Sequence, residues 1–158
     1  MRKVIFITIF MFAACLPGYS VAAETELFST WERFEADKCA SIWLIKRFIS
    51  PKAEIRFFPQ GDVISEGIPF DTPDAEFRRY YNRSTFETLL HHYKIADPKA
   101  VYIGRIIHDI EINIWGNKML PETYRVIEDV QPVITSKSSD ESVAWCLSYF
   151  DKFYEKQN

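Results

Sequence analysis

Several basic side chains lie close enough in the sequence to form an anion-binding site. Lys46 and Arg47 fall in an apolar segment of helical spacing, and Arg78, Arg79 and Arg83 flank two adjacent tyrosines. A guanidinium group is planar and donates paired hydrogen bonds to oxyanions such as chromate, sulfate or phosphate. The cluster predicts an oxyanion site if the fold brings its members together. The alternative is a solvated surface, on which the long side chains cover the core and keep their charges in water.

A second set of residues could bind a metal or move protons. His108 and Glu111 are three positions apart with Asp109 between them, so on a helix the imidazole and the Glu111 carboxylate share one face. Such groups are ligands for a divalent metal or partners in proton transfer. Glu87 and His91, four positions apart, form a similar pair. For both pairs the alternative is a local contact between neighbouring side chains.

Motifs and charge narrow the function classes. The chain has no G-x-S-x-G, H-E-x-x-H, C-x-x-C or glycine-rich phosphate-loop pattern, so catalysis is not favoured. A metal-dependent enzyme that uses His108, Asp109 and Glu111 stays open, as does an interaction module without a ligand. With 19 basic and 22 acidic residues the formal net charge is −3, which argues against nucleic acid as a partner.

The N-terminal residues have the pattern of a secretory signal peptide. Arg2 and Lys3 precede an apolar run over 4–14, and small residues follow up to Ala23. Cleavage after Ala23 predicts a periplasmic or secreted protein without a transmembrane helix, because the apolar run is too short to cross a bilayer. Cys15 follows an imperfect lipobox, so a lipid anchor at Cys15 is the alternative.

The rest of the chain is long enough for one domain. Removal of residues 1–23 leaves 135 residues with a net charge of −5, and we expect a single domain over 27–155. Two cysteines survive this processing, Cys39 and Cys146. In an oxidising compartment they could form a disulfide that joins the two ends of the domain, whereas two buried free thiols are the alternative.

Hydrophobic spacing and turn residues predict a mostly helical domain. Apolar residues recur at helical spacing over 38–49 with Asp37 as the expected N-cap, and Ser84 with Glu87 has the pattern of a capping box. The predicted helices span 38–49, 85–93, 98–113, 121–135 and 140–154, and the predicted strands span 53–58, 68–71 and 76–81. We therefore expect an α+β fold, a mostly helical single domain with a small two- to three-stranded sheet.

The segment over 37–49, DKCASIWLIKRFI, resembles a family signature. It is similar to the pattern D-R-x-A-S-x-W-L-I-R-R-F-I of the chromate resistance exported protein family, which is also found as the C-terminal domain of ChrB-type chromate-responsive regulators. Later family motifs match in order: Pro69-Phe70-Asp71, Ala75-Glu76-Phe77, Thr85-Phe86-Glu87-Thr88-Leu89-Leu90 and Ile107-His108-Asp109. The resemblance implies that the domain binds or senses a small inorganic oxyanion.

One departure from the family pattern bears on the site. Where many members have F-x-H-x-G-x-x-C-T-F-E, this chain has Arg79 at the His position and Ser84 at the Cys position. Neither is a ligand that a transition metal prefers, but both donate hydrogen bonds to anions. We expect an oxyanion site formed by Arg47, Arg79, Arg83 and Ser84. The alternative is that the family fold persists without the site.

Overall fold

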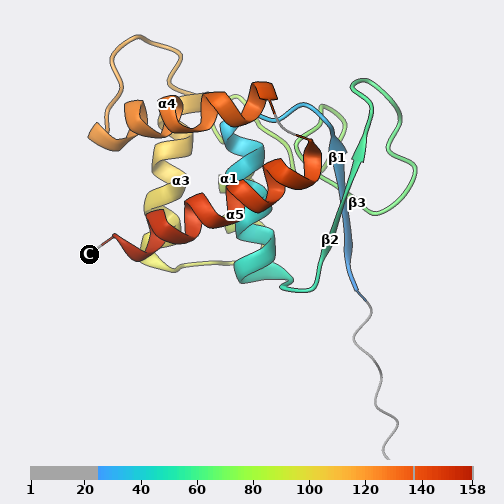
Figure 1. The fold of residues 1–158 in the computed structure, drawn as a ribbon. Coiled ribbons are helices and arrows are strands. Elements are labelled where there is room, and N and C mark those ends of the chain that lie inside the picture. The colour runs from blue at the N-terminus through green and yellow to red at the C-terminus, as the bar shows by residue number, and fades with distance from the viewer. Residues whose placement is uncertain (1–24, 137, 158) are drawn as a thin grey trace, which may run out of the picture.

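The computed structural model describes residues 25–136 and 138–157, so the expected signal peptide and Cys15 lie outside the described residues. Within these residues the chain forms three strands and five α-helices (Figure 1). The strands are β1 (Leu27–Trp31), β2 (Glu54–Phe58) and β3 (Ile68–Pro69), and the helices are α1 (Ala36–Leu44), α2 (Thr85–His92), α3 (Pro98–Glu111), α4 (Pro121–Ser136) and α5 (Ser139–Glu155). A π-helical turn, η1 (Ile45–Ile49), extends α1. The expected α+β class, mostly helical with a small sheet, is confirmed.

The sheet is built around β1, which lies between β2 and β3 and runs parallel to both. Pairing with β2 begins with Leu27 opposite Glu54 and ends with Trp31 opposite Phe58. Residues 28–30 of β1 are buried, as expected of a central parallel strand. The sequence analysis did not identify β1, because a strand of five residues carries too few side chains to show a clear alternation.

The expected strand over 76–81 is wrong. The segment takes part only in two isolated bridges, Phe70 with Phe77 and Tyr80 with Arg83. Tyr80 donates its backbone N–H to the carbonyl of Arg83 at 2.7 Å, so the chain closes a tight turn here. The aromatic residues favour a strand by intrinsic propensity, but tertiary context overrides that preference.

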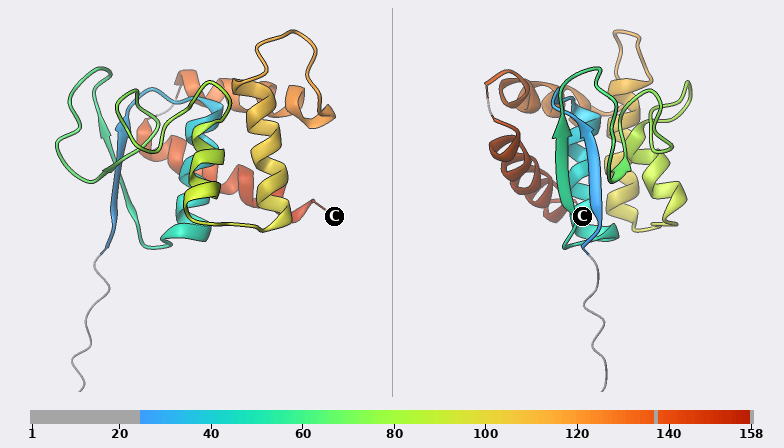
Figure 2. Two further views of the ribbon diagram at one scale, coloured as in Figure 1. Left: turned by 180° about the vertical axis from the view of Figure 1, so that it is seen from behind. Right: turned by 90° about the vertical axis from the view of Figure 1, so that its right-hand side faces the viewer.

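Helix α1 is the centre of the domain, and all nine of its residues are buried. It packs against α5 on one side and against α2 and α3 on the other (Figure 2). Cys39 of α1 and Cys146 of α5 form a disulfide with a Cα–Cα distance of 5.3 Å. In the structure the two ends of the domain are therefore joined covalently.

Two of the helix starts test the expected capping. The Ser84 hydroxyl accepts the Glu87 N–H and the Glu87 carboxylate accepts the Ser84 N–H, which is the predicted capping box of α2. The expected N-cap role of Asp37 is wrong, since Glu35 occupies that position and Asp37 lies inside α1. Asp37 is instead buried against a different helix, which sequence spacing alone does not reveal.

The core gathers around Trp43, whose ring is fully buried on α1. Its centroid lies 5.4–6.4 Å from those of Phe48, Phe86, Phe150 and Tyr154. This aromatic cluster joins α1, α2 and α5 into one packed unit. None of the helices formed by the described residues is long and apolar enough to span a membrane.

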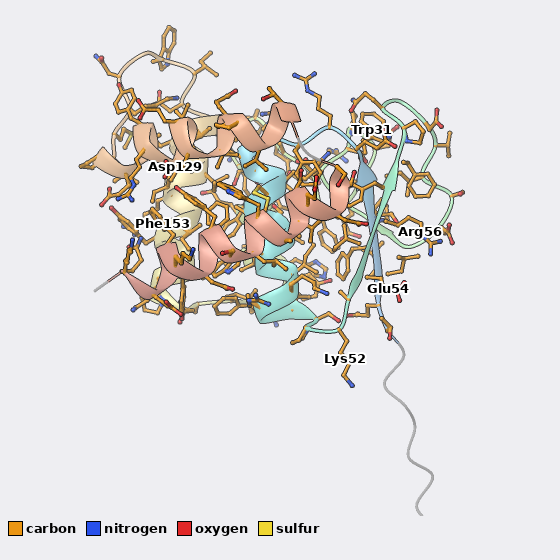
Figure 3. All side chains as sticks on the ribbon, viewed as in Figure 1. Trp31, Lys52, Glu54, Arg56, Asp129 and Phe153 are labelled. Carbon is orange, nitrogen blue, oxygen red and sulfur yellow. A yellow bond between two sulfur atoms is a disulfide. The ribbon has the colours of Figure 1, made fainter. Side chains whose placement is uncertain are left out.

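The three parallel strands end at one edge of the sheet. Figure 3 shows Trp31 at this edge, whereas Lys52 lies near the opposite end. The segments that follow the strands, over 32–35, 59–67 and 70–84, start from the same edge, where α1 also begins. Ligands of open α/β sheets commonly bind outside the carboxyl ends of the strands, so this edge is where a site is expected.

Candidate functional site

A small pocket of about 290 Å³ lies at the carboxyl edge of the sheet, and we call it the carboxyl-edge pocket. Its lining comes from residues that follow the three strands or open α1: Trp31, Arg33, Glu35, Lys38, Gln60, Asp71, Thr72, Pro73, Arg78 and Arg79. Four of these side chains are basic and two are acidic, although the whole chain has a formal net charge of −3. The pocket is therefore a local concentration of positive charge.

Lys38 is the most buried of the basic residues in the pocket lining. Its ammonium group donates to the carbonyls of Trp31 at 2.7 Å and Arg33 at 2.6 Å, and it lies 3.6 Å from the Asp71 carboxylate. Burial lowers the pKa of Lys38, and the negative charge of Asp71 opposes that shift. Lys38 thus fixes the turn between β1 and α1 and brings a positive charge into the pocket wall.

Asp71 is held in the left-handed backbone region, with φ 52°, which is uncommon for a residue other than glycine. Its carboxylate accepts the Thr85 hydroxyl at 2.8 Å, and its backbone N–H donates to the Phe77 carbonyl at 2.7 Å. Burial raises the pKa of Asp71, while the charge of Lys38 works in the opposite direction. The carboxyl group is fixed in place and takes up a proton more readily than an exposed aspartate.

Asp37 lies next to this group and connects α1 to α2. Its carboxylate accepts the backbone N–H groups of Thr85 at 2.7 Å and Phe86 at 2.8 Å, the first residues of α2. The positive end of α2 favours a carboxylate there. Burial nevertheless raises the pKa of Asp37 well above its ordinary value, and the charges of Asp71 and Glu111 raise it further.

Arg79 joins the pocket to the end of α3. Its guanidinium donates to the Glu111 carboxylate at 2.5 Å, and Glu111 also accepts the backbone N–H of Asp37. Burial raises the pKa of Glu111, whereas the charge of Arg79 lowers it. Because the Arg79 side chain is half exposed and a guanidinium has five N–H donors, donors remain for an anion in the pocket.

Two further arginines line the pocket. Arg78 donates to the Ala75 carbonyl at 2.9 Å, and its guanidinium carbon lies 4.6 Å from the centre of the Tyr80 ring. No carboxylate pairs with Arg78 among residues 25–136 and 138–157. Arg33 is largely exposed and lies 3.7 Å from Glu35. Arg78 is therefore the basic side chain of the lining with the least compensation by an acidic partner.

Comparison with known protein families supplies an independent assignment. The model of the ChrB C-terminal domain matches residues 28–157. The chain belongs to the ChrB C-terminal domain family. The resemblance in the signature over 37–49 is thereby confirmed, and the family connects the chain with chromate resistance. No curated protein and no solved structure matched the chain.

The motifs of this ChrB-family domain converge on the pocket only in part. The signature supplies Lys38, which lines the pocket, and Asp37, which lies beside Asp71. The Pro-Phe-Asp motif supplies Asp71, which also lines the pocket. Arg79, at the position where many members have His, also lines the pocket. Ser84, at the Cys position, is buried and caps α2 with its hydroxyl oxygen.

The structure does not gather the four residues of the expected oxyanion site. Arg47 forms two hydrogen bonds with the Asp151 carboxylate, at 2.8 and 2.7 Å, and so links η1 to α5. Arg83 lines a separate hollow together with two histidines. With Ser84 engaged as a cap, Arg79 is the one member of the expected set in the lining of the carboxyl-edge pocket.

The proposed metal-binding or proton-transfer pair is not formed, because His108 and Glu111 contact different residues. The His108 ring nitrogen Nδ1 lies 2.8 Å from the Glu87 carboxylate, whereas Glu111 pairs with Arg79. Across the described ranges, no group of three or more His, Cys, Asp or Glu residues is arranged to hold a metal ion. The Glu87–His108 contact ties α2 to α3.

Asp109, the third proposed metal ligand, is buried and serves the start of α4. Burial by itself would raise the pKa of Asp109, but hydrogen bonds to its carboxylate outweigh burial and hold the pKa below its ordinary value. The donors are the Asn113 amide, the Thr123 hydroxyl and the backbone N–H groups of Met119 and Leu120. These hydrogen bonds give the Asp109 carboxylate a structural role at the start of α4.

The sequence analysis missed Arg33, Glu35 and Asp71 as site residues and gave Lys38 no role in the site. A signal was present, because Arg33 and Glu35 directly follow β1 and Asp71 directly follows the bridge of Phe70 to the sheet. Without β1, the sequence did not show where the carboxyl ends of the strands meet.

Proposed function

We propose that this domain binds a small inorganic oxyanion, chromate or a chemically similar ion, in the carboxyl-edge pocket. The observation that carries the proposal is the basic lining of Arg33, Lys38, Arg78 and Arg79 in a chain whose net charge is −3. Membership of the ChrB family and its connection with chromate resistance support the same ligand class.

The chemistry of the lining suits an oxyanion. Arg78 and Arg79 supply planar guanidinium groups, which donate paired hydrogen bonds to oxyanion oxygens. Lys38 adds a positive charge in a buried position, where water screens it less than at the surface. The negative charge of Asp71 is offset by Lys38, whose ammonium group lies 3.6 Å from the Asp71 carboxylate.

The size of the pocket also favours a small ion. A cavity of about 290 Å³ lies just below the range for organic ligands, roughly 300–1,000 Å³. A tetrahedral oxyanion with a few bound waters needs no apolar enclosure, and the lining offers charged and polar groups from three loops. We therefore infer a binding function for the pocket.

We further propose that binding takes place in the cell envelope. This inference rests on the sequence pattern of Arg2, Lys3, the apolar run over 4–14 and the small residues up to Ala23. A lipid anchor at Cys15 would retain the domain at a membrane, whereas cleavage after Ala23 would release it. The mass of the mature protein and its distribution between membrane and soluble envelope fractions distinguish the two products.

The metal-dependent enzyme gains no support from the contacts of its proposed ligands. Asp109 accepts four hydrogen bonds at the start of α4, and Glu111 is paired with Arg79. Addition of Zn²⁺ or Mn²⁺ to the purified domain, followed by calorimetry, tests this alternative directly. Stoichiometric binding that His108→Ala abolishes would favour a metal site over the oxyanion proposal.

The binding proposal is tested by thermal unfolding of the mature domain with chromate, sulfate, phosphate or chloride at constant ionic strength. We expect a saturable rise in Tm with an oxyanion, because a ligand at a hundred times its Kd stabilises the folded state by about 2.7 kcal/mol. Arg78→Ala and Arg79→Ala should each remove most of the rise.

Arg83→Ala is the matched control, because Arg83 lies near Arg79 in the sequence but lines a different hollow. It should retain the rise. Absence of a rise in the wild-type domain with every oxyanion would refute the proposal. Equal loss in Arg79→Ala and Arg83→Ala would refute the assignment to this pocket.

A further inference from the structure

A second cavity of about 690 Å³ lies between α3, α4 and α5, and we call it the helix groove. Its lining includes Tyr102 of α3, Arg125 of α4, and Tyr149 and Phe153 of α5, none of which lines the carboxyl-edge pocket. Figure 3 shows Phe153 on the helical side of the molecule, away from the sheet. The volume falls within the range of roughly 300–1,000 Å³ that is typical of sites for organic ligands.

Aromatic rings form the apolar part of the helix groove. On α5, Trp145 stacks on Tyr149 with ring centroids 4.7 Å apart, and Tyr149 lies 6.2 Å from Phe153 at an interplanar angle of 28°. The three rings are half-buried and follow one another at helical spacing. Their packing holds Tyr149 and Phe153 in a fixed orientation, which favours stacking of a further planar ring.

The tyrosine hydroxyls are already hydrogen-bonded. Tyr102 donates to the Glu122 carboxylate at 2.9 Å, and Tyr149 donates to the Asp129 carboxylate at 3.0 Å. Both rings are therefore anchored at their polar ends. Glu122 is the acidic residue of the groove lining, and Asp129 lies beside it, with its carboxylate also 3.5 Å from the Arg125 guanidinium.

Basic side chains surround the rings. Lys99, Arg125, Lys152 and Lys156 all belong to the lining. Lys152 in the last turn of α5 and Lys156 at its C-cap are exposed, and neither has a side-chain hydrogen bond or ion pair in the part of the chain that the structure describes. These four basic residues outnumber the carboxylates of Glu122 and Asp129, so the groove keeps a positive charge in a chain of net charge −3.

We propose that the helix groove binds a planar aromatic anion, with its ring against Tyr149 and Phe153 and its anionic group toward Lys152 and Arg125. The apolar rings distinguish this site from the carboxyl-edge pocket, and the basic residues select an anionic ring over a neutral one. The proposal is independent of oxyanion binding at the sheet edge, because the two linings share no residue.

Calorimetric titration of the mature domain with 1-naphthyl phosphate and 2-naphthoate tests the proposal, with 2-naphthol and inorganic phosphate as matched probes. Each aromatic anion should bind with a Kd at least about tenfold lower than either matched probe, a difference of about 1.4 kcal/mol. Comparison of the phosphate and the carboxylate identifies the preferred anionic group. Equal binding of 2-naphthol would refute the role of charge, and equal binding of phosphate would refute the role of the rings.

Charge-reversing substitutions locate the site without disturbing the core, since the residues are exposed. Lys152→Glu and Arg125→Glu should each raise the Kd for the better aromatic anion by at least about tenfold. Lys52 is an exposed lysine near the far end of the sheet (Figure 3), and Lys52→Glu should change the Kd by less than about twofold. Unchanged Tm values establish that the variants are folded. An equal effect of all three substitutions, or no binding by the wild-type domain, would overturn the proposal.

Discussion

Opening the Cys39–Cys146 disulfide should destabilise the domain by several kcal/mol. The two cysteines are separated by 107 positions in the sequence, so the bond restricts most of the unfolded chain. The chain-entropy model gives about 4.8 kcal/mol at 25 °C for a loop of this length, and measured contributions of disulfides are typically about 2–4 kcal/mol. Because domains have a free energy of unfolding of about 5–15 kcal/mol, the loss is a large fraction of the total.

The disulfide also bears on the proposed pocket. Cys39 directly follows Asp37 and Lys38, and its bond to Cys146 holds this part of α1 against α5. Lys38 lines the pocket, and the Asp37 carboxylate bonds to the start of α2. Loss of the cross-link should therefore weaken any oxyanion-dependent rise in Tm as well as lower the Tm itself.

The measurement compares oxidised protein with protein that was unfolded, reduced and refolded in the presence of a reductant. Reduction keeps both sulfur atoms in the core, so packing changes little and the difference reports the cross-link. Urea unfolding followed by tryptophan fluorescence should show a loss of about 2–5 kcal/mol, and thermal unfolding a fall in Tm of roughly 7–18 °C. Cys39→Ala combined with Cys146→Ala should lose at least as much stability.

Two results would refute this reasoning. If the free energies of unfolding of oxidised and reduced protein agree within about 1 kcal/mol, the cross-link does not stabilise the domain as the loop length predicts. If protein denatured without reductant exposes both thiols to a thiol reagent, the disulfide does not form.

Further substitutions test the structural roles of single residues by urea unfolding. Asp109→Asn should cost about 2–3 kcal/mol at neutral pH, because a charged acceptor of four hydrogen bonds is replaced. The lowered pKa of Asp109 means that its contribution is present above the unfolded value of about 3.9 and is lost as the pH falls through the folded value. The stabilities of wild type and variant should therefore converge in acid, and a pH-independent difference would contradict the assignment. Ser84→Ala should cost about 1 kcal/mol through loss of the α2 cap, and an unchanged stability would count against the capping role. Gly67→Ala should cost more stability than Gly61→Ala. Both glycines have a positive φ, 76° and 93°, but a Cβ added at Gly67 would lie only 2.5 Å from the Ser29 hydroxyl, whereas one added at Gly61 meets nothing within 4 Å. Equal losses of stability would show that the close approach at Gly67 is relieved.

Two aspartates of the family motifs have structural partners that explain their burial. Asp37 of α1 accepts the first N–H groups of α2, and Asp109 of α3 accepts the N–H groups of Met119 and Leu120 before α4. In each case a carboxylate on one helix satisfies backbone donors near the start of another. Asp37 and Asp109 therefore support the packing of helices, and neither lines the carboxyl-edge pocket.

Local features were predictable where hydrogen bonds connect near neighbours. The capping box of Ser84 and Glu87 lies within four consecutive residues, and Pro98 marks the first turn of α3 as its fixed φ favours. The four residues of the expected oxyanion site do not lie together, because that site required side chains from separate elements to meet. Arg47 found Asp151 on α5 instead, a partner 104 positions away.

The amino-acid sequence by itself determined the fold class, the positions of the helices and the ChrB family, because helical periodicity, caps and ordered motifs are written in neighbouring residues. Tertiary structure alone decided that β1 pairs with two parallel strands, that Cys39 meets Cys146, and that Arg79 rather than Arg47 or Arg83 reaches the pocket. Those outcomes depend on how helices pack and strands align over long separations in the chain. Residue type and spacing can suggest which side chains form a site, but the packing of the elements decides which of them meet.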